Sequence, residues 1–431
     1  MDIYVAGFLI LIMIAILASG LWIGLTLLGV AVVAMEFFTT KSGGDSMVLT
    51  IWGSTTSWTL TALPLFLWMG EILFRSKLTA DMFKGLAPWL NNIPGRLLHT
   101  NVIGCGIFAA VSGSSAATCA TIGKITLPEL KKRGYPDDIS MGSLAGSGTF
   151  GLLIPPSIIM IVYGVAADVS ISKLFVAGVL PGIGLMAMFS TYIIIWSLFN
   201  KDKIPAGDMQ MSFIEKVKAG RHLIPIVSLI AVVIGAIYSG FATATESAAM
   251  GVLGSLILSK IEGSLNWKSF KEGLFAACRV YCMIGLILAG AAFLTLSMGF
   301  IGLPREVAQF IGSLNLTPFM LIVMLTVFFI ILGCFLDGIS MVVLTMAVLL
   351  PTVQAANFDL IWFGIFVVLV VEMAQITPPV GFNLFVLQGL TKRELPYLAK
   401  TALPFFFLLV FAVLLIYLFP QIVLIGPQMM G

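Results

Sequence analysis

The chain has 431 residues, of which 59% are hydrophobic and only 10% are charged. Soluble globular proteins are about 45–50% apolar and about 25% charged, so this composition excludes a water-soluble domain and predicts an integral membrane protein. The 23 basic and 20 acidic residues leave a net charge of +3, which gives no indication of a nucleic-acid partner. The five cysteines lie in apolar runs, where neither a disulfide framework nor a zinc site is expected.

Apolar stretches follow one another along the whole chain, separated by charged or Pro/Gly-rich breaks. Residues 1–38 lack the basic start and the small-residue cleavage site of a signal peptide, so we expect two spans there. A transmembrane helix needs about 20 apolar residues to cross a hydrocarbon layer roughly 30 Å thick. The predicted stretches are 3–18, 21–38, 49–74, 98–129, 139–165, 172–199, 222–239, 243–259, 274–300, 319–351, 361–389 and 397–425.

The two halves of the chain share a register of prolines. Prolines inside helices cost about 3 kcal/mol each, and their ordinary clustering at helix ends would not produce one common offset. At a single offset and without a gap, Pro128 aligns with Pro351, Pro155 and Pro156 with Pro378 and Pro379, and Pro181 with Pro404. We therefore predict a duplication, with repeat 1 at residues 1–199, a cytoplasmic linker at 200–221 and repeat 2 at 222–431.

Each repeat divides into the same series of parts. Repeat 1 contains scaffold helices (1–75), an arm (76–97), hairpin 1 (98–133), a broken helix (139–165) and a helix (172–199). Repeat 2 contains scaffold helices (222–300), an arm (302–314), hairpin 2 (319–354), a broken helix (361–389) and a helix (397–425). Surface loops remain an alternative for the two arms. Five crossings and one hairpin in each half would invert the second repeat relative to the first, as in secondary transporters. The predicted fold is an all-α polytopic membrane protein with two inverted-topology repeats.

The distribution of basic residues agrees with this inversion. If the N-terminus lies outside, all of the 23 basic residues except Lys41, Lys173 and Arg305 fall on the cytoplasmic side. Cytoplasmic loops of membrane proteins carry such an excess of Lys and Arg. We therefore expect both termini to lie outside, in the periplasm or the extracellular space.

Small polar residues interrupt one stretch in each repeat. The run Ser112-Gly113-Ser114-Ser115 divides 98–129 into two arms of about 14 residues, each rising about 21 Å, which is too short for a crossing. Gly333 and Leu336-Asp337-Gly338 divide 319–351 in the same way. Irregular backbone at this depth must be buried in protein, which favours re-entrant hairpins. Two short crossings around a turn remain an alternative.

Adjacent prolines break the span that follows each hairpin. Because proline lacks the N–H that bonds four residues back, the carbonyl groups of Gly151, Leu152, Ala374 and Gln375 are predicted to lack helical partners. Free carbonyls beside Ser and Thr hydroxyls are hard oxygen donors that suit a cation such as Na⁺. A structural kink repaired by water or hydroxyl groups is the alternative.

Asp337 and Glu372 are the carboxylates expected inside the apolar layer, where ionisable groups indicate function. Asp337 could instead serve only to cap a hairpin helix, and Glu372 could only hydrogen-bond to a neighbouring helix. No Arg or Lys is expected at mid-depth to hold an anion. A substrate carboxylate would then be held by half-helix N-termini, hydroxyl groups and bound cations.

Three motifs stand out at the first tip and the two breaks. They are Ser112-Gly113-Ser114-Ser115-Ala116, Gly146-Ser147-Gly148-Thr149-Phe150-Gly151-Leu152-Leu153-Ile154-Pro155-Pro156-Ser157 and Thr377-Pro378-Pro379-Val380-Gly381-Phe382-Asn383. Together they resemble the large membrane subunit (M, or DctM-like) of tripartite ATP-independent periplasmic (TRAP) transporters. The resemblance covers essentially the whole chain, and the motifs fall in both repeats.

The resemblance implies a Na⁺-driven importer of an organic acid in the bacterial inner membrane. Sialic acid, C4-dicarboxylates and related sugar or keto acids are all open as substrates. The implied partners are a small membrane subunit (Q), expected as a separate chain, and a periplasmic substrate-binding protein. Hairpins and broken helices would move as an elevator against the scaffold.

The expected sites lie at the hairpin tips and the helix breaks. One Na⁺ site is predicted at Ser112, Gly113, Ser114, Ser115, Thr149 and Gly151. A second is predicted at Gly333, Asp337, Gly338, Gln375 and Thr377. Substrate is predicted to contact Ser115, Ser157, Asp337 and Asn383, between the two tips.

Other readings of the sequence are weaker. Gly146 to Gly151 match the dinucleotide pattern G-x-G-x-x-G but lie in an apolar span without a βαβ unit. A serine hydrolase needs a base beside its nucleophile, and both histidines, His99 and His222, lie at cytoplasmic ends of elements, so we expect no enzyme. A stand-alone Na⁺-coupled carboxylate carrier without a binding protein is the main alternative.

Overall fold

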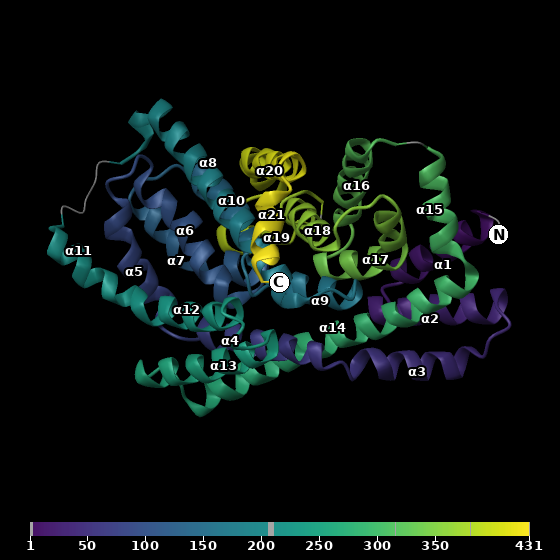
Figure 1. Cartoon of the computed structure of the whole chain (residues 1–431). Coiled ribbons are helices and arrows are strands. Elements are labelled where there is room, and N and C mark those ends of the chain that lie inside the picture. The colour runs from purple at the N-terminus through teal and green to yellow at the C-terminus, as the bar shows by residue number, and fades with distance from the viewer. Residues whose placement is uncertain (1–2, 206–210, 315, 380, 431) are drawn as a thin grey trace.

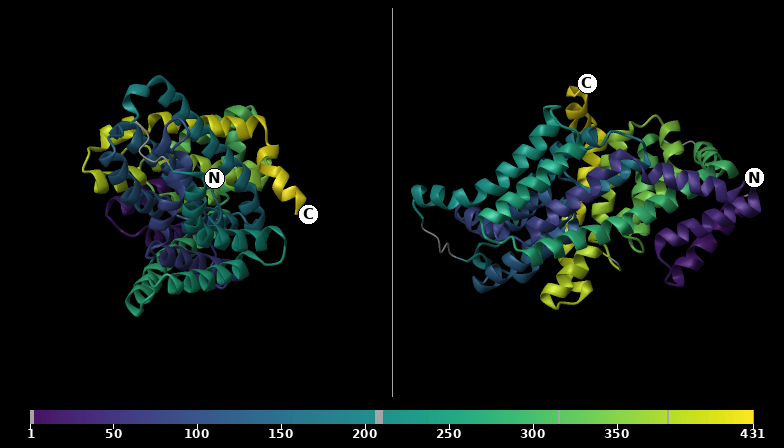
Figure 2. Two further views of the ribbon diagram at one scale, coloured as in Figure 1. Left: turned by 90° about the vertical axis from the view of Figure 1, so that its left-hand side faces the viewer. Right: turned by 90° about the horizontal axis from the view of Figure 1, so that it is seen from below.

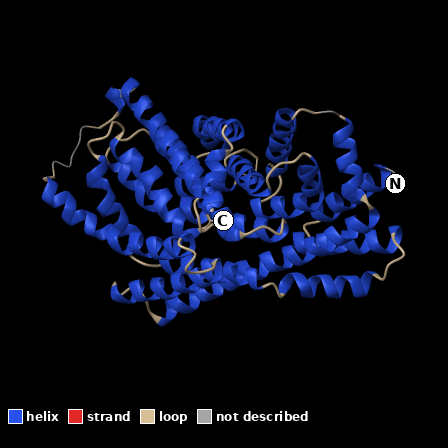
Figure 3. Cartoon of the chain, in the orientation of Figure 1, coloured by secondary structure: helices blue, strands red, loops and turns tan. Residues whose placement is uncertain are grey.

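The computed structural model describes residues 3–205, 211–314, 316–379 and 381–430, and these residues form helices and loops without a strand (Figure 3). Residues 206–210 of the predicted linker and Val380 of the second proline motif lie outside the described residues. A single continuous cluster of buried apolar side chains joins the helices. The predicted all-α class is confirmed.

The first half of the chain folds into helices α1 to α10, with short 3₁₀ turns between some of them (Figure 1). Their bounds are α1 (Ile3–Ala18), α2 (Ile23–Phe38), α3 (Gly43–Thr55), α4 (Ala62–Phe74), α5 (Leu78–Leu90), α6 (His99–Ser112), α7 (Ser115–Lys132), α8 (Asp137–Gly148), η3 (Thr149–Gly151), α9 (Ile158–Ala166) and α10 (Ile171–Phe199).

The second half contains helices α11 to α21. Their bounds are α11 (Phe213–Gly220), α12 (Ile224–Tyr238), α13 (Ala244–Ile261), α14 (Trp267–Ile301), α15 (Leu303–Ser313), α16 (Pro318–Gly333), α17 (Gly338–Ala355), α18 (Leu360–Gln375), α19 (Phe382–Thr391), α20 (Leu395–Leu418) and α21 (Gln421–Met429).

The helix bounds repeat at the offset that aligns Pro128 with Pro351. Both ends of α7 match both ends of α17 at this offset, the start of α8 matches the start of α18, and the end of α2 matches the end of α13. The Pro155–Pro156 and Pro378–Pro379 peptide bonds are both cis. The series α1 to α10 thus returns as α12 to α20, with the long helix α14 in the place of α3 and α4 together.

Helix α4 lies beside α14, its counterpart in the second repeat, and the two run in opposite directions. Arg75 at the C-terminal end of α4 donates to Glu272 near the start of α14, with a distance of 2.9 Å from Nη1 to Oε2. Helices α2, α3, α4, α13 and α14 lie along the lower edge of Figure 1, and α5 and α15 lie at opposite ends of the molecule.

The two broken helices are antiparallel as well. At one end, Arg393 after α19 donates to Asp137 at the start of α8 (Nη2 to Oδ2, 2.7 Å). At the other end, the Tyr163 hydroxyl of α9 donates to the Leu360 carbonyl at the start of α18 (2.6 Å). The second repeat is therefore inverted relative to the first.

Two predicted spans are interrupted. A bend of 53° separates α3 from α4 within the predicted stretch 49–74. The hydroxyl groups of Thr55 and Thr56 donate to backbone carbonyls four residues back, both at 2.7 Å, and such bonds bend helices. The predicted helix 397–425 ends at Leu418, because Pro420 cannot continue the backbone ladder, and α21 follows it.

The predicted linker contains a helix that the sequence analysis missed. Helix α11 starts with a capping box in which Ser212 accepts from the Glu215 N–H and Glu215 accepts from the Ser212 N–H. A capping box satisfies two donors that the first helical turn otherwise leaves free. The signal was present in the sequence, but the polar composition of 200–221 obscured it.

Several helices have the length and composition of membrane spans. Among the described residues five helices qualify singly, or six if the bent pair α3 and α4 counts as one span. Shorter apolar helices include α2, α16, α18 and α19. The molecule is elongated, with α1 at one end of its long axis and α21 about halfway along it (Figures 1 and 2).

Candidate functional site

The tip of hairpin 1 is a two-residue turn between α6 and α7. Gly113 ends α6 with a φ of +61°, a conformation that glycine adopts without steric cost. Ser114 then caps α7 by accepting from the Ala117 N–H at 3.4 Å. The Ser112 and Thr118 hydroxyl groups lie 2.7 Å apart across the turn. The predicted break at this polar run is present. It places the C-terminal end of α6 and the N-terminal end of α7 next to each other at the tip.

The tip of hairpin 2 is longer and is organised by Asp337. Helix α16 ends at Gly333, and Asp337 caps α17 by accepting from the N–H groups of Ile339 (3.1 Å) and Ser340 (3.3 Å). The Ser340 hydroxyl also donates to the Asp337 carboxylate. Asp337 therefore caps α17, as the alternative role anticipated. Its carboxylate also lies at the tip of hairpin 2.

The first broken helix packs directly against the hairpin 1 tip. The Ile158 N–H at the start of α9 donates to the Gly113 carbonyl at 3.3 Å. A Cβ atom on Gly151 would lie 2.5 Å from the Ser114 carbonyl carbon and oxygen, so the backbones touch there. Ser157 caps α9 by accepting from the Met160 N–H at 3.3 Å. Glycine at 113 and 151 is what allows the tip and the break to meet.

The second broken helix meets the hairpin 2 tip in the same manner. A Cβ atom on Gly333 would lie 2.1 Å from the Cβ of Ala374. The Cys334 thiol donates to the Pro378 carbonyl at 3.3 Å. A Cβ atom on Gly381 would lie 3.0 Å from the Gln375 carbonyl oxygen, so this carbonyl faces the start of α19. Each repeat thus pairs one tip with one break.

The prediction of four free carbonyl groups was wrong for two of them. The Leu152 carbonyl accepts from the Ser157 hydroxyl, and the Ala374 carbonyl accepts from the Thr377 N–H at 3.2 Å. A hydroxyl and a tight turn repair these two positions locally. For the Gly151 and Gln375 carbonyls, no hydrogen-bond donor is present in the part of the chain that the structure describes.

Gln375 connects the two halves of the site. Its side-chain oxygen accepts from the Ser115 hydroxyl of hairpin 1 at 3.5 Å. Its side-chain nitrogen lies 3.4 Å from where a Cβ would stand on Gly338 at the tip of hairpin 2, and Ile159 Cδ1 lies 3.4 Å from the same point. Residues 115, 159, 338 and 375, from four different elements, therefore meet around one buried side chain.

The structure brings most of the predicted site residues together. The hairpin 1 set (Ser112, Gly113, Ser114, Ser115) lies against Gly151, and the hairpin 2 set (Gly333, Asp337, Gly338) lies against the end of α18. The hydroxyl groups of Thr149 and Thr377 donate to carbonyls of their own helices, Gly146 O at 2.8 Å and Met373 O at 2.7 Å. The roles of these residues in binding stay predictions.

Asn383 lies beside the end of α8, where the Cβ position of Gly148 is 3.0 Å from its side-chain nitrogen. Its side-chain N–H donates to the Ala145 carbonyl at 3.2 Å, and no hydrogen bond within the described residues joins it to Ser115, Ser157 or Asp337. Its side-chain oxygen is buried without a hydrogen-bond partner among the described residues. Asn383 therefore joins α19 to α8 in this structure.

Two further residues belong to this region, although neither was included in the predicted binding sites. Glu372 is fully buried. Neither of its carboxylate oxygens forms a hydrogen bond within the described residues. The Thr149 hydroxyl lies near enough to interact with the carboxylate. Gly70 of α4 approaches the hairpin 1 tip, with its Cβ position 3.2 Å from the Ser112 carbonyl oxygen. Of these two residues, only Glu372 could be recognised from the sequence, as one of the two carboxylates expected in the apolar layer.

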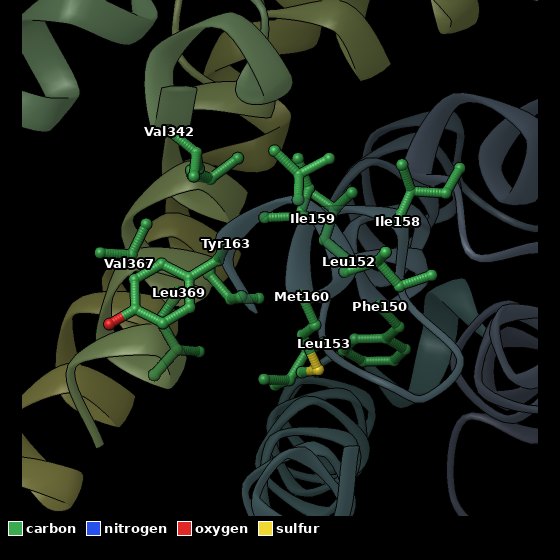
Figure 4. Close-up of a cluster of buried hydrophobic side chains, with 14 of the residues drawn as sticks. Phe150, Leu152, Leu153, Ile158, Ile159, Met160, Tyr163, Val342, Val367 and Leu369 are labelled. Carbon is green, nitrogen blue, oxygen red and sulfur yellow. The ribbon is translucent and has the colours of Figure 1, made fainter. Parts of the chain in front are cut away.

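Apolar side chains hold the broken helices to each other. Figure 4 shows Ile159 and Tyr163 of α9, Val342 of α17, and Val367 and Leu369 of α18 gathered in one buried cluster. Leu152, Leu153 and Ile158 extend it along the first break. These contacts join residues of both repeats, so the first break, α9, α18 and α17 of hairpin 2 pack together.

Comparison with known proteins confirms the resemblance. Residues 10–422 match the family described as tripartite ATP-independent periplasmic transporter, DctM component. The C4-dicarboxylate TRAP transporter large permease protein DctM of Pseudomonas aeruginosa is 30% identical over 389 residues, covering 90% of this chain and 90% of that protein. The sialic acid TRAP transporter large permease protein SiaM of Vibrio cholerae is 26% identical over 418 residues, covering 96% of each chain. These relatives are named as transporter permeases and not as enzymes.

The fold is also known from a crystal structure. The Alcanivorax borkumensis YdaH transporter, whose topology is described as unusual, superposes with a TM-score of 0.66 over 94% of this chain and 97% of that chain, at 12% sequence identity. The inverted repeats, the family match and the permease relatives lead to the same conclusion. The chain belongs to the DctM component family of tripartite ATP-independent periplasmic transporters.

Proposed function

We propose that this large permease couples the inward movement of Na⁺ to the uptake of an organic acid at the junction of the two hairpin tips. The observation that carries the proposal is the position of Gln375, which contacts Ser115 of hairpin 1 and lies beside Gly338 of hairpin 2. A group bound there would touch inverted elements from both repeats, as alternating access requires.

Helix ends supply the attraction for an acid. Helices α7, α9 and α17 begin at Ser115, Ile158 and Gly338, and each N-terminus carries roughly half a positive charge. No Lys or Arg lies in these tips or breaks. A substrate carboxylate would therefore be held by backbone N–H groups and by the Ser115 hydroxyl, with bound cations balancing its charge.

The oxygen atoms around the tips suit Na⁺. At hairpin 1 the Gly151 carbonyl and the Ser112 and Ser114 hydroxyl groups are hard donors, and at hairpin 2 the Asp337 carboxylate and the Gln375 carbonyl are of the same kind. C-terminal ends of α6 and α18 lie beside these donors and add partial negative charge. The donor set fits an alkali cation and contains no soft ligand except the Cys334 thiol.

We further propose an elevator motion. The broken helices and α17 of hairpin 2 are joined by the cluster in Figure 4 and by the Arg393–Asp137 pair, and hairpin 1 is joined to α9 by the hydrogen bond from Ile158 to Gly113. By contrast, α4 and α14 are joined by the Arg75–Glu272 pair. The first group would slide as one body against the second. With most basic residues facing the cytoplasm, both termini would be periplasmic in the inner membrane.

The family relationship supports a proposal on the substrate and the partners. Relatives are named for C4-dicarboxylate and for sialic acid, so we propose an acid of this kind, delivered by a periplasmic binding protein. A separate small membrane subunit would complete the transporter. The alternative is a stand-alone Na⁺-coupled carboxylate carrier.

Uptake into proteoliposomes tests the proposal. The full chain is reconstituted alone, with its small subunit, and with both the subunit and the binding protein, each with and without an inward Na⁺ gradient. We expect uptake of the acid only in the complete system and only with the Na⁺ gradient. Uptake by the chain alone would support the stand-alone carrier, and rates that do not change with Na⁺ would overturn the coupling.

A further inference from the structure

A charged cavity lies between the scaffold helices α4 and α14, away from the hairpin tips. It has a volume of about 420 Å³ and is lined by Arg75, Lys271, Glu272, Phe275, Ala276 and Arg279. Three of these residues are cations and one is an anion. The cavity joins one helix from each repeat, and the proposed transport mechanism assigns it no role.

The positive charge of the cavity comes from Lys271 and Arg279. Arg75 is matched by two carboxylates, Glu272 at 2.9 Å and Glu71 at 3.3 Å. Lys271 and Arg279 form no ion pair within the described residues, and both are exposed. The Lys271 ammonium group instead lies 5.8 Å from the centroid of the Phe275 ring. Two cations thus remain available to an anion.

The helical spacing places these groups on one face. Lys271, Phe275 and Arg279 follow one another at intervals of four residues, so they line one side of α14 over two turns, about 12 Å. Long basic side chains can bend toward each other across an intervening apolar residue. Both cations can therefore approach the same anion.

The same face lies at the edge of the membrane. Residues 280–301 of α14 contain no charged side chain, and their rise of about 33 Å matches the hydrocarbon layer. Arg279 therefore marks the border of the apolar layer, with Lys271 in the headgroup region. Trp267, which is exposed and stacks on Phe270, stands at the same end, where aromatic side chains are typical of the membrane interface.

We propose that this cavity binds the phosphate of an anionic phospholipid, with an acyl chain lying along α14. Exposed apolar side chains continue from Phe275 of the cavity (59% exposed) into the apolar layer, where Cys282 and Met283 (50% exposed) follow on α14. A free phosphate ion would leave this strip uncovered. Basic pockets between transmembrane helices bind anionic headgroups in this manner. The lipid would bridge the two repeats at the scaffold.

Native mass spectrometry of the full chain, in mild detergent and with any subunit that co-purifies, tests this proposal. Phosphatidylglycerol, phosphatidylcholine and inorganic phosphate are titrated separately. The double variant Lys271→Gln/Arg279→Gln removes two cations from the cavity. Lys260→Gln/Lys268→Gln removes two exposed cations from the same end of the molecule, outside the cavity lining.

We expect phosphatidylglycerol to bind the unaltered chain. Its affinity for Lys271→Gln/Arg279→Gln should be roughly thirtyfold lower, because each removed cation weakens the attraction to an anionic headgroup roughly fivefold. The outer-lysine variant should bind as the unaltered chain does. Equal binding by both double variants overturns the proposal. So does binding of phosphatidylcholine or inorganic phosphate as tight as that of phosphatidylglycerol, or a co-purified subunit that prevents lipid binding.

Discussion

Asp337 and Asp359 perform the same local task at the start of two helices. Asp337 accepts from the N–H groups of Ile339 and Ser340, and Asp359 accepts from those of Ile361 and Trp362 at 2.8 and 3.0 Å. Asp337 caps the helix at the hairpin 2 tip, whereas Asp359 caps α18 far from its break. Variants at these two positions therefore distinguish the stability that is lost with a helix cap from the uptake that is lost with a binding carboxylate.

We predict that Asp337→Asn abolishes Na⁺-dependent uptake although asparagine still caps a helix well. Asp337→Ala should lose both the cap and the uptake. The measurement is the initial uptake rate across a Na⁺ titration, with the folded protein in the membrane quantified in parallel. The control Asp359→Ala should lose about 1 kcal/mol of stability and keep most of its uptake. Wild-type rates in Asp337→Asn would refute the role of the carboxylate.

Glu372 allows a prediction on stability. A buried carboxyl group without hydrogen bonds costs free energy, and glutamine has the same shape without the ionisable group. We expect Glu372→Gln to have a thermal unfolding midpoint at or above that of the unaltered chain. Glu372→Ala should be destabilised because it leaves a cavity. A midpoint for Glu372→Gln several degrees lower would show that the carboxylate makes a stabilising interaction.

At the scale of elements, close backbone approach determines how each tip meets its break. Gly113 contacts the Pro156 carbonyl, with its Cβ position only 2.7 Å away, and Gly151 contacts Ser114. No side chain fits in either place. These contacts set the distance between the C-terminal end of α6 and the N-terminal end of α9, and therefore the spacing of the oxygen donors.

We predict that Gly151→Ala displaces the hairpin 1 tip, lowers the thermal unfolding midpoint and abolishes uptake, because a methyl group 2.5 Å from backbone atoms forces the two elements apart. Gly389→Ala is the matched control, since the Cβ position of Gly389 in α19 has no neighbour within 4 Å. Alanine in a helix interior is favoured over glycine by roughly 0.5–1 kcal/mol, so this variant should be as stable as the unaltered chain or more so. Normal uptake by Gly151→Ala would contradict the described contact.

At the scale of the whole molecule, the proposed motion requires α4 to slide past hairpin 1. Gly70 of α4 lies against Val111 and Ser112 of α6. In a background without native cysteines, we predict that oxidation of Gly70→Cys/Val111→Cys stops uptake and that reduction restores it. The pair Met69→Cys/Gly251→Cys joins α4 to α13 within the proposed scaffold, so its oxidation should leave uptake unchanged. Uptake by the oxidised first pair would exclude the elevator motion.

The topology can be tested by labelling single cysteines. Ser42 lies in the loop between α2 and α3, and Ser264 lies in the loop between α13 and α14. In a cysteine-free background, we expect an impermeant thiol reagent added to whole cells with a permeabilised outer membrane to label Ser42→Cys and not Ser264→Cys. The opposite pattern would reverse the proposed orientation.

The duplication was predictable because proline and charge act locally. A proline removes one N–H wherever it stands, so the shared offset of Pro155–Pro156 and Pro378–Pro379 marked both breaks before any contact was known. The bend between α3 and α4 was not predicted, because hydrogen bonds from Thr hydroxyl groups to carbonyls of the preceding turn are a weak signal inside a long apolar stretch. Helix α11 was not predicted, because a capping box is a weak signal inside a polar stretch.

By itself, the sequence determined the membrane class, the two repeats, the tips and the breaks, since hydropathy and missing N–H groups depend on neighbours along the chain. Only the tertiary structure decided that Gln375 stands between both tips and that Lys271 and Arg279 line a cavity with Arg75. These arrangements join residues from different helices. Their distances depend on how the helices pack, which no local pattern specifies.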